Sequence, residues 1–279
     1  MTKKGSLLVV GTGIKAGGHL SAEAQSAIKN ADKVFYADGN PLSVYQIKSF
    51  NPNAETLSDL YGKGKPRYET YAQMVERIIT AVREGFQVCA IFYGHPGVFA
   101  SPSHISIRQA RAEGFEALML PGISAEDCIF ADLGIDPGVY GCQSYEATDF
   151  LVYRRVFDRR STLVLWQVGA IGQADYQGKI FAEQQGGLAL LVETLLESYP
   201  AEHTAVVYEA ATMAIFVPRI ERVGIGQLGK SVLTSMSTLV IVPEPKWSDP
   251  DLERARQLGI EDHILKVKEF KEKLFEEIE

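Results

Sequence analysis

Short apolar segments alternate with longer segments of helical periodicity through the first half of the chain. The apolar segments are rich in Val, Ile, Leu and Phe, as buried strands are. They occupy residues 6–11, 33–38, 54–57, 87–94 and 115–122. The helical segments begin near Ser21, Leu42, Thr70, Ser103 and Ser124. This alternation predicts a mostly parallel sheet whose strands are joined by crossover helices, which is an α/β architecture.

The clearest helix lies between Thr70 and Gly85. Its apolar residues recur at helical spacing and should form one buried face. They are Met74, Val75, Ile78, Ile79 and Val82. We expect Thr70 to cap the start of this helix and Gly85 to end it.

The pattern changes near residue 136, where Pro, Gly and polar residues interrupt the alternation. Strand-like segments dominate after that point, at residues 161–168, 203–211, 219–226 and 237–243. The sequence therefore predicts an N-terminal α/β domain over residues 1–135 and a C-terminal mixed α/β domain over residues 136–243. A charged helical tail over residues 244–279 should follow.

The tail carries apolar residues at helical spacing among many charges. They are Ile264, Leu265, Val267, Phe270, Leu274 and Ile278. Two interpretations stay open: a surface helix with an ordinary buried stripe, or a helix that docks onto a partner or a second subunit.

Composition and charge restrict the class of protein. The 279 residues are 46% hydrophobic and carry a net charge of −7, which argues against a general affinity for nucleic acid or anionic membrane. The apolar stretch after the N-terminus is too short for a secretory signal or a membrane span. We expect a cytoplasmic protein in which Cys89, Cys128 and Cys142 are buried reduced thiols.

The histidines give no support to a metal site. There are five, and they are scattered without any of the spacings that bind zinc. They are His19, His95, His104, His203 and His263. We therefore expect no metal.

The segment VVGTGIKAGGHLS, residues 9–21, contains Gly11, Gly13 and Ala16 at the spacing of a dinucleotide-binding loop. In that motif the helix begins at once, so its N-terminus can meet the pyrophosphate. Here Gly17, Gly18 and His19 prolong the loop before a helix can begin at Ser21. A nicotinamide oxidoreductase is therefore only an alternative interpretation.

Three more polar segments follow or flank strand ends, where open α/β sheets bind their ligands. They are SDLYGKGKPRYETY at 58–71, YGHPGVFASPSH at 93–104 and PGISAEDC at 121–128. A tight turn explains Gly94 and Gly97, and helix capping explains Ser124, without any function. Because several such segments would gather at one edge, a binding crevice there is the alternative.

These strings also carry a resemblance to a known family. Their order, followed by STLVLWQVG, resembles the tetrapyrrole methylase superfamily, which depends on S-adenosylmethionine. YGHPGVF, LPGISAEDC, CQSYEATDFL and YGKGKPRYETYAQM more closely resemble the borosin α-N-methyltransferases, which methylate backbone amides of a precursor peptide. The similarity runs from about residue 5 to 243. It implies two α/β domains with the cofactor between them, and a homodimer whose partner strand helps to close each site.

The resemblance implies a set of cofactor-binding positions in both domains. These are Tyr93, His95, Val98, Phe99, Ser124, Ala125, Gln167, Tyr208, Ala211, Ser237 and Thr238. Taken singly, some of them could be core or strand residues. The bound molecule would be S-adenosylmethionine, with S-adenosylhomocysteine as the product.

Methylation of a backbone amide needs help, because resonance draws the nitrogen lone pair into the carbonyl group. Negative charge must grow on the amide oxygen, and fixed donors stabilise it. Arg67 suits that task, while Tyr71 suits the role of base or proton relay and Tyr61 that of a positioning donor. Tyr93 would orient the reacting groups. A basic surface loop that contains Lys63 and Lys65 is the alternative interpretation.

Two features depart from the fused members of that family. Ser58 stands where the family usually has another tyrosine, three residues before Tyr61. The chain also has no Val/Ile/Leu-rich segment after the tail, so we expect methylation of a separate peptide in trans, within a heterotetramer of the dimer and two peptides. The alternatives are a precorrin-type tetrapyrrole C-methyltransferase and an impaired enzyme that serves as a peptide-binding scaffold.

Overall fold

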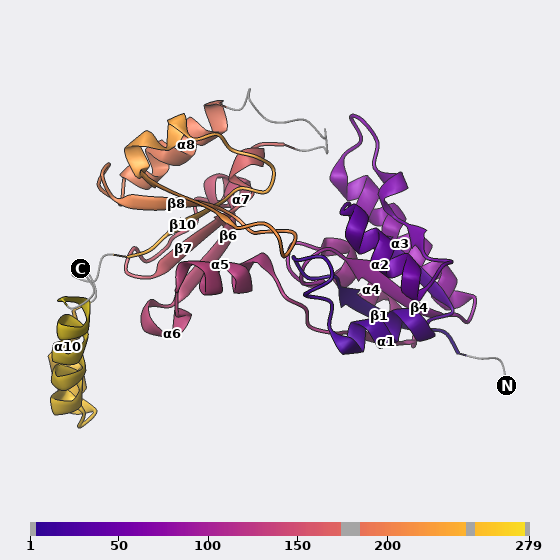
Figure 1. The fold of residues 1–279 in the computed structure, drawn as a ribbon, viewed down its shortest axis with the longest axis horizontal. Coiled ribbons are helices and arrows are strands. Elements are labelled where there is room, and N and C mark those ends of the chain that lie inside the picture. The colour runs from indigo at the N-terminus through magenta and orange to yellow at the C-terminus, as the bar shows by residue number, and fades with distance from the viewer. Residues whose placement is uncertain (1–3, 174–184, 244–248, 277–279) are drawn as a thin grey trace.

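The computed structural model describes residues 4–173, 185–243 and 249–276, which form two sheets with their covering helices and a separate tail (Figure 1). The first sheet, drawn in indigo to magenta, contains the N-terminal strands, and the second contains the strands after residue 141. This arrangement confirms the predicted fold class of a parallel sheet followed by a mixed one.

The first sheet has the strand order β3-β2-β4-β1-β5, and every pair in it is parallel. Its strands are β1 (Ser6–Gly11), β2 (Lys33–Ala37), β3 (Glu55–Thr56), β4 (Gln87–Phe92) and β5 (Glu116–Met119). The helices α1 (Ala22–Asn30), α2 (Pro41–Phe50), α3 (Arg67–Arg83) and α4 (Ser101–Ala112) connect them, with a 3₁₀ turn η1 (Ser58–Leu60) before α3.

Alternation along the strands divides the apolar side chains between the two faces of this sheet. Val9 packs in a core with α3, whereas Val10 packs in a second core with α1 and α2. Both side chains are fully buried. A strand that is apolar on both faces is what a sheet covered by helices on both sides requires.

The second sheet has the strand order β6-β7-β10-β8-β9 and is mixed, since only β6 and β7 are parallel. Its strands are β6 (Cys142–Glu146), β7 (Thr162–Trp166), β8 (Thr204–Glu209), β9 (Arg219–Gly224) and β10 (Thr238–Ile241). Around them lie α6 (Pro137–Tyr140), α7 (Ala147–Val152), η2 (Val168–Ala170), α8 (Gln185–Leu196) and η3 (Ile225–Lys230). The sequence pattern did not indicate β6, α7 or α8.

The helix α5 (Ala125–Leu133) packs with the second sheet rather than the first. Its Cys128 and Ile129 share a core with Val164 and Val240, and Figure 1 shows α5 beneath β7 and β6. We refer to the first sheet with α1–α4 as the first body, and to the second sheet with its helices and α5 as the second body. The domain boundary after residue 135 stays a prediction. Ser124 caps α5 as expected, since its hydroxyl accepts the Glu126 N–H at 3.0 Å.

Three local expectations were wrong. The helix α3 begins at Arg67, directly after Pro66, whose ring holds φ at −58°, and no side chain caps it. Thr70 is therefore a buried residue inside the helix. The helix α4 begins at Ser101, two residues before the predicted start. Cys142 is only half-buried, although Cys89 and Cys128 are buried thiols as expected.

The tail forms α9 (Leu252–Gln257) and α10 (Glu261–Glu276), which lie apart from both sheets in Figure 1. Phe270 of the predicted stripe is 65% exposed, whereas Ile264 and Val267 are half-buried, so the described chain covers only part of that stripe. The side chains of Leu274 and Ile278 lie outside the described residues. Within the described ranges, no helix is both long and apolar enough to cross a membrane.

The ends of β1 and β4 lie in close backbone contact. Gly13 and Gly94 exchange two hydrogen bonds, with N···O distances of 3.2 and 3.1 Å. A Cβ atom on Gly11 would lie 2.0 Å from the Gly94 carbonyl oxygen, so this approach requires glycine. The glycines of the first loop thus allow two loops of the protein to meet.

We predict that Gly11→Ala destabilises the fold by about 1–3 kcal/mol, because the two loops must separate to admit the methyl group. Chemical denaturation followed by circular dichroism measures this change. Gly39→Ala is the matched control, since a Cβ atom there meets no atom within 4 Å. Equal stability of the two variants would contradict the prediction.

Candidate active site

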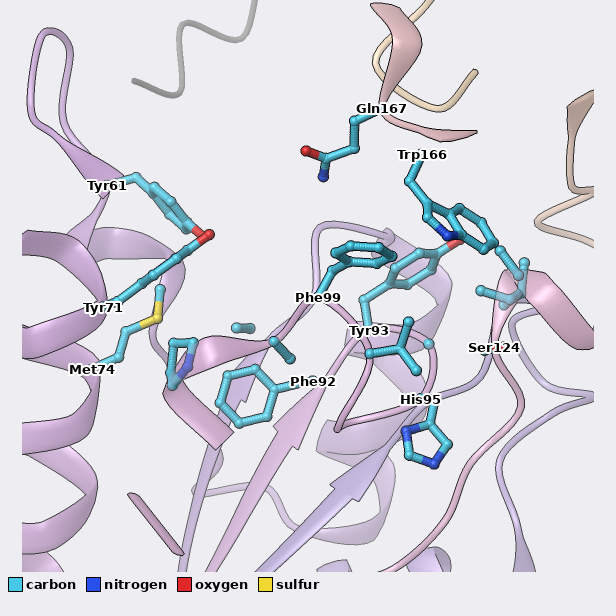
Figure 2. Close-up of a pocket in the computed structure, with 17 residues that line it drawn as sticks. Tyr61, Tyr71, Met74, Phe92, Tyr93, His95, Phe99, Ser124, Trp166 and Gln167 are labelled. Carbon is cyan, nitrogen blue, oxygen red and sulfur yellow. The ribbon is translucent and has the colours of Figure 1, made fainter. Parts of the chain in front are cut away.

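A cavity of about 280 Å³ lies where the first sheet's strand ends face the start of η2 in the second body (Figure 2). Ligand pockets are of this size or larger and have mostly apolar walls with a few polar groups. Its lining consists of Ile14, Ala37, Tyr61, Tyr71, Met74, Phe92, Tyr93, Gly94, His95, Val98, Phe99, Ala100, Pro102, Ser124, Ala125, Trp166 and Gln167.

Tyr61 and Tyr71 form one wall of the cavity. Tyr61 follows η1 and Tyr71 lies in the second turn of α3, and Figure 2 shows both rings reaching into the cavity with their hydroxyl ends toward each other. Arg67 begins the same helix four residues before Tyr71, so the two occupy one helix face. Arg67 is half-buried and lies outside the cavity lining.

Tyr93 rises from the end of β4 into the middle of the cavity. Its backbone N–H donates to the Ala37 carbonyl at 3.3 Å, which fixes the residue beside the end of β2. Its hydroxyl is buried and has no hydrogen-bond partner among the described residues. A buried hydroxyl without a partner is costly, so this group is suited to a bound molecule.

Burial raises the pKa of Tyr93 to about 12, and the Asp38 carboxylate adds to the shift. Asp38 is itself buried at the end of β2. Its carboxylate accepts the Thr12 hydroxyl at 2.8 Å and the Asn40 N–H at 2.7 Å. At neutral pH Tyr93 is therefore a neutral phenol that can donate a hydrogen bond but cannot readily take up a proton.

Phe99 and Trp166 close the cavity from opposite bodies. Their ring centroids lie 5.6 Å apart with an interplanar angle of 58°, a geometry that aromatic pairs favour. The Trp166 indole donates to the Ser144 hydroxyl at 2.5 Å, which fixes the ring on β7. This pair joins the first body to the second at the cavity.

Phe99 and Gln167 both have backbone conformations that are unusual for residues other than glycine, with φ values of 51° and 58°. Such conformations cost free energy and concentrate at functional sites. Gln167 directs its amide toward the cavity in Figure 2. His95 accepts the Gly97 N–H on its Nδ1 at 2.9 Å and so stabilises the turn before Phe99.

The structure brings together most of the residues that the sequence indicated. Those that line the cavity are Tyr61, Tyr71, Tyr93, His95, Val98, Phe99, Ser124, Ala125 and Gln167. Those outside its lining are Arg67, Tyr208, Ala211, Ser237 and Thr238.

Side-chain contacts explain two of the outlying positions. The Tyr208 hydroxyl donates to Asp132 at 2.6 Å, and the fully buried Ser237 donates to Glu209 at 2.6 Å. Both side chains therefore stabilise the second body. Ala211 and Thr238 are buried beside them.

Sequence reasoning missed Ile14, Met74 and Trp166, which also line the cavity. Met74 belonged to the apolar stripe of α3 and was assigned to the core. Trp166 directly precedes Gln167, and that adjacency was the one signal in the sequence that could have indicated it.

The chemistry of the lining favours an organic molecule over a metal ion. Aromatic rings supply the walls, and the unpartnered Tyr93 hydroxyl and the Gln167 amide supply polar groups. Across the described ranges, no group of three or more His, Cys, Asp or Glu residues could hold a metal ion.

The fold, the crevice at the strand ends and the sequence all define one class of protein. Residues 6–228 match the profile of the tetrapyrrole (corrin/porphyrin) methylases, and the chain belongs to that family. A uroporphyrin-III C-methyltransferase from Thermus thermophilus has the same fold, with a TM-score of 0.60 over 85% of this chain and 94% of that one, at 18% identity.

Within the family, the sequence is more similar to methyltransferases that carry a borosin or cyclic peptide precursor than to the uroporphyrin-III C-methyltransferase. A methyltransferase and cyclic peptide dendrothelin A precursor from Dendrothele bispora is 44% identical over 88% of this chain and 59% of its own length. A methyltransferase and type I borosin cyclic peptide precursor from Coprinopsis marcescibilis is 41% identical over 93% of this chain and 68% of its own length. The resemblance inferred from the sequence is confirmed, and the chain spans about 60% of the length of the first relative.

The buried phenol gives a pH-dependent prediction. Because the pKa of Tyr93 is raised to about 12, its neutral form persists well above the usual tyrosine pKa of about 10. The ultraviolet difference between wild type and Tyr93→Phe should therefore show no tyrosinate from this residue below about pH 11. In Asp38→Asn the ionisation should move to lower pH. Ionisation near pH 10 in the folded protein would contradict the assignment.

Proposed function

We propose that this chain is an S-adenosylmethionine-dependent methyltransferase that methylates backbone amides of a separate ribosomal precursor peptide, as part of borosin biosynthesis. The observation that carries the proposal is the convergence of the Tyr61, Tyr71 and Tyr93 side chains on one cavity at the strand ends. The similarity to borosin precursor methyltransferases over about nine-tenths of the chain supports it.

The cofactor would occupy the part of the cavity between Tyr93, Phe99 and Gln167. Aromatic faces there suit a purine ring and a sulfonium group, and the Gln167 amide can bind polar edges. His95 would act by shaping the turn that presents Val98 and Phe99. When bound, S-adenosylmethionine supplies an electrophilic methyl group.

The remaining residues would activate the peptide amide. Tyr71, once ionised to the phenolate, would take up the amide proton, directly or through water, while Tyr61 positions the peptide by a hydrogen bond. Arg67 is suited to stabilise the negative charge on the amide oxygen, because it begins α3 on the helix face of Tyr71 and is not engaged by another side chain of the described residues. It would have to turn toward the cavity when the peptide binds.

Tyr93 would have a different role from Tyr71. Because its pKa is raised to about 12, we assign it as an O–H donor that orients the amide or the cofactor rather than as the base. Holding both reactants in line would supply much of the remaining rate enhancement.

The departure at Ser58 is compatible with activity. Ser58 is exposed, begins η1 and does not line the cavity. The scaffold alternative rested on this position alone, whereas the aromatic groups assigned to catalysis are all present in the lining.

We further propose that the protein acts as a homodimer that binds its peptides in trans, giving a heterotetramer. The loop between β8 and β9 exposes Ile215, Phe216 and Val217, with Ile215 82% and Val217 86% exposed. A contiguous apolar run on the surface is typical of an interface.

Tandem mass spectrometry of a candidate precursor peptide, co-expressed with this protein as a separate chain, tests the proposal. We predict methyl groups on backbone nitrogens, and a rate lowered about 10²–10³-fold by Arg67→Ala. Arg67→Lys should recover little of that loss, because lysine lacks the planar fork of the guanidinium. Tyr71→Phe should lower the rate while S-adenosylhomocysteine still binds.

Lys63→Ala is the matched control, since Lys63 is exposed in the same loop. It should leave the rate within about twofold of wild type. A peptide that binds but stays unmodified would favour the scaffold. Methylation of a tetrapyrrole carbon at a rate that Arg67→Ala leaves unchanged would favour the precorrin-type activity. Methylation confined to this chain itself would overturn action in trans.

A further inference from the structure

The loop between β1 and α1, residues 12–20, is not explained by the catalytic assignment. It follows a strand end, like the cavity segments, yet only Ile14 of the loop lines the cavity. Three glycines leave its backbone few local constraints, so something else must hold it in place.

The His19 side chain supplies that constraint. Its Nδ1 accepts the backbone N–H groups of Ile14 and Lys15, with N···N distances of 3.3 and 3.2 Å. The backbone N–H of His19 in turn donates to the Lys15 carbonyl at 3.1 Å, which closes the loop on itself. A ring nitrogen that accepts two N–H groups must carry no proton.

The part of the loop that His19 fixes, residues 14–16, contacts both bodies. Ile14 is 3% exposed and packs in the apolar core formed by α5 and the second sheet, together with Trp166. Ala16 donates its N–H to the Thr212 carbonyl, after β8, at 3.0 Å. His19 therefore acts on two consecutive residues, one of which forms cavity wall and interdomain core at once.

We propose that His19 is a positioning residue, whose neutral imidazole holds this bridge and so maintains the cofactor cavity, which opens when the ring is protonated. The inference rests on the proposed function in one respect, namely that the cavity binds S-adenosylmethionine. It adds a pH-sensitive constraint outside the groups that would touch the cofactor.

Burial of the ring sets the direction of the pH effect, and two nearby charges modify it. Burial lowers the pKa of His19, Lys15 of the same loop lowers it further, and Asp127 of α5 raises it. Thr212 and its neighbours Ala211 and Met213 carry no charge. Because the pKa is lowered from 6.5 in the folded loop, the bridge is fully stable above pH 6.5 and weakens as the pH falls below that value.

Three variants of His19 show whether the loop depends on the hydrogen-bond acceptor Nδ1 or only on the size of the side chain. In His19→Asn the amide oxygen can occupy about the place of Nδ1 but does not titrate, whereas in His19→Gln the oxygen lies one bond farther out. His19→Ala removes the acceptor altogether. Loss of two hydrogen bonds to the loop predicts roughly tenfold weaker cofactor binding in His19→Ala and His19→Gln than in wild type at pH 8, with no further fall from this position at lower pH.

The test measures binding of S-adenosylhomocysteine by calorimetry between pH 5 and 8.5 for wild type and the three variants. We expect wild-type affinity to fall below pH 6.5 and His19→Asn to bind like wild type at pH 8 without that fall. The difference between these two proteins isolates His19 from His95 and His104. The proposal would be overturned if His19→Gln or His19→Ala bound S-adenosylhomocysteine with wild-type affinity at pH 8.

Hydrogen–deuterium exchange of the backbone amides of residues 12–20, measured without ligand, reports the stability of the loop independently of cofactor binding. Exchange should be slow in wild type and His19→Asn at pH 8 and faster in His19→Ala. If wild type fails to bind S-adenosylhomocysteine while this pattern holds, the proposed function fails and the role of His19 in the loop stands. Equal exchange in all variants would refute that role.

Discussion

The close backbone contact between the ends of β1 and β4 is the constraint on which the site depends. Gly13 and Gly94 pair directly, and Gly11 leaves room for the Gly94 carbonyl. Because these two strand ends meet, Tyr93 and the turn after it stand at the centre of the cavity, and Ile14 reaches the second body. A single backbone contact thus determines both the position of the central phenol and the approach of the two bodies.

The cavity combines groups whose environments differ strongly. Tyr61 and Tyr71 reach in from the η1–α3 region, while Tyr93 is buried beside the Asp38 carboxylate. Aromatic contact between Phe99 and Trp166 spans the two bodies. Burial and the neighbouring Asp38 carboxylate keep the Tyr93 phenol protonated even above the usual tyrosine range, because both raise its pKa.

Much of this arrangement could be predicted from the sequence, because short apolar strands and amphipathic helices carry strong periodic signals. The parallel sheet, the cap at Ser124 and the crevice at the strand ends followed from those signals. The start of α3 did not, since Pro66 replaced a side-chain cap. Nor did the membership of α5 in the second body or the part of Trp166 in the cavity, because both depend on contacts between distant segments.

The backbone at Gln167 has a consequence for the evolvability of the site. Its left-handed conformation favours glycine, yet glycine would remove the amide that faces the cavity. Backbone stability and an amide in the cavity wall therefore make opposite demands at this position. Asparagine, which tolerates the same conformation, offers a shorter amide at lower backbone strain. Replacing Gln167 by asparagine would thus widen the cavity without refolding the turn, which makes this position an accessible one for changing the size of the cavity.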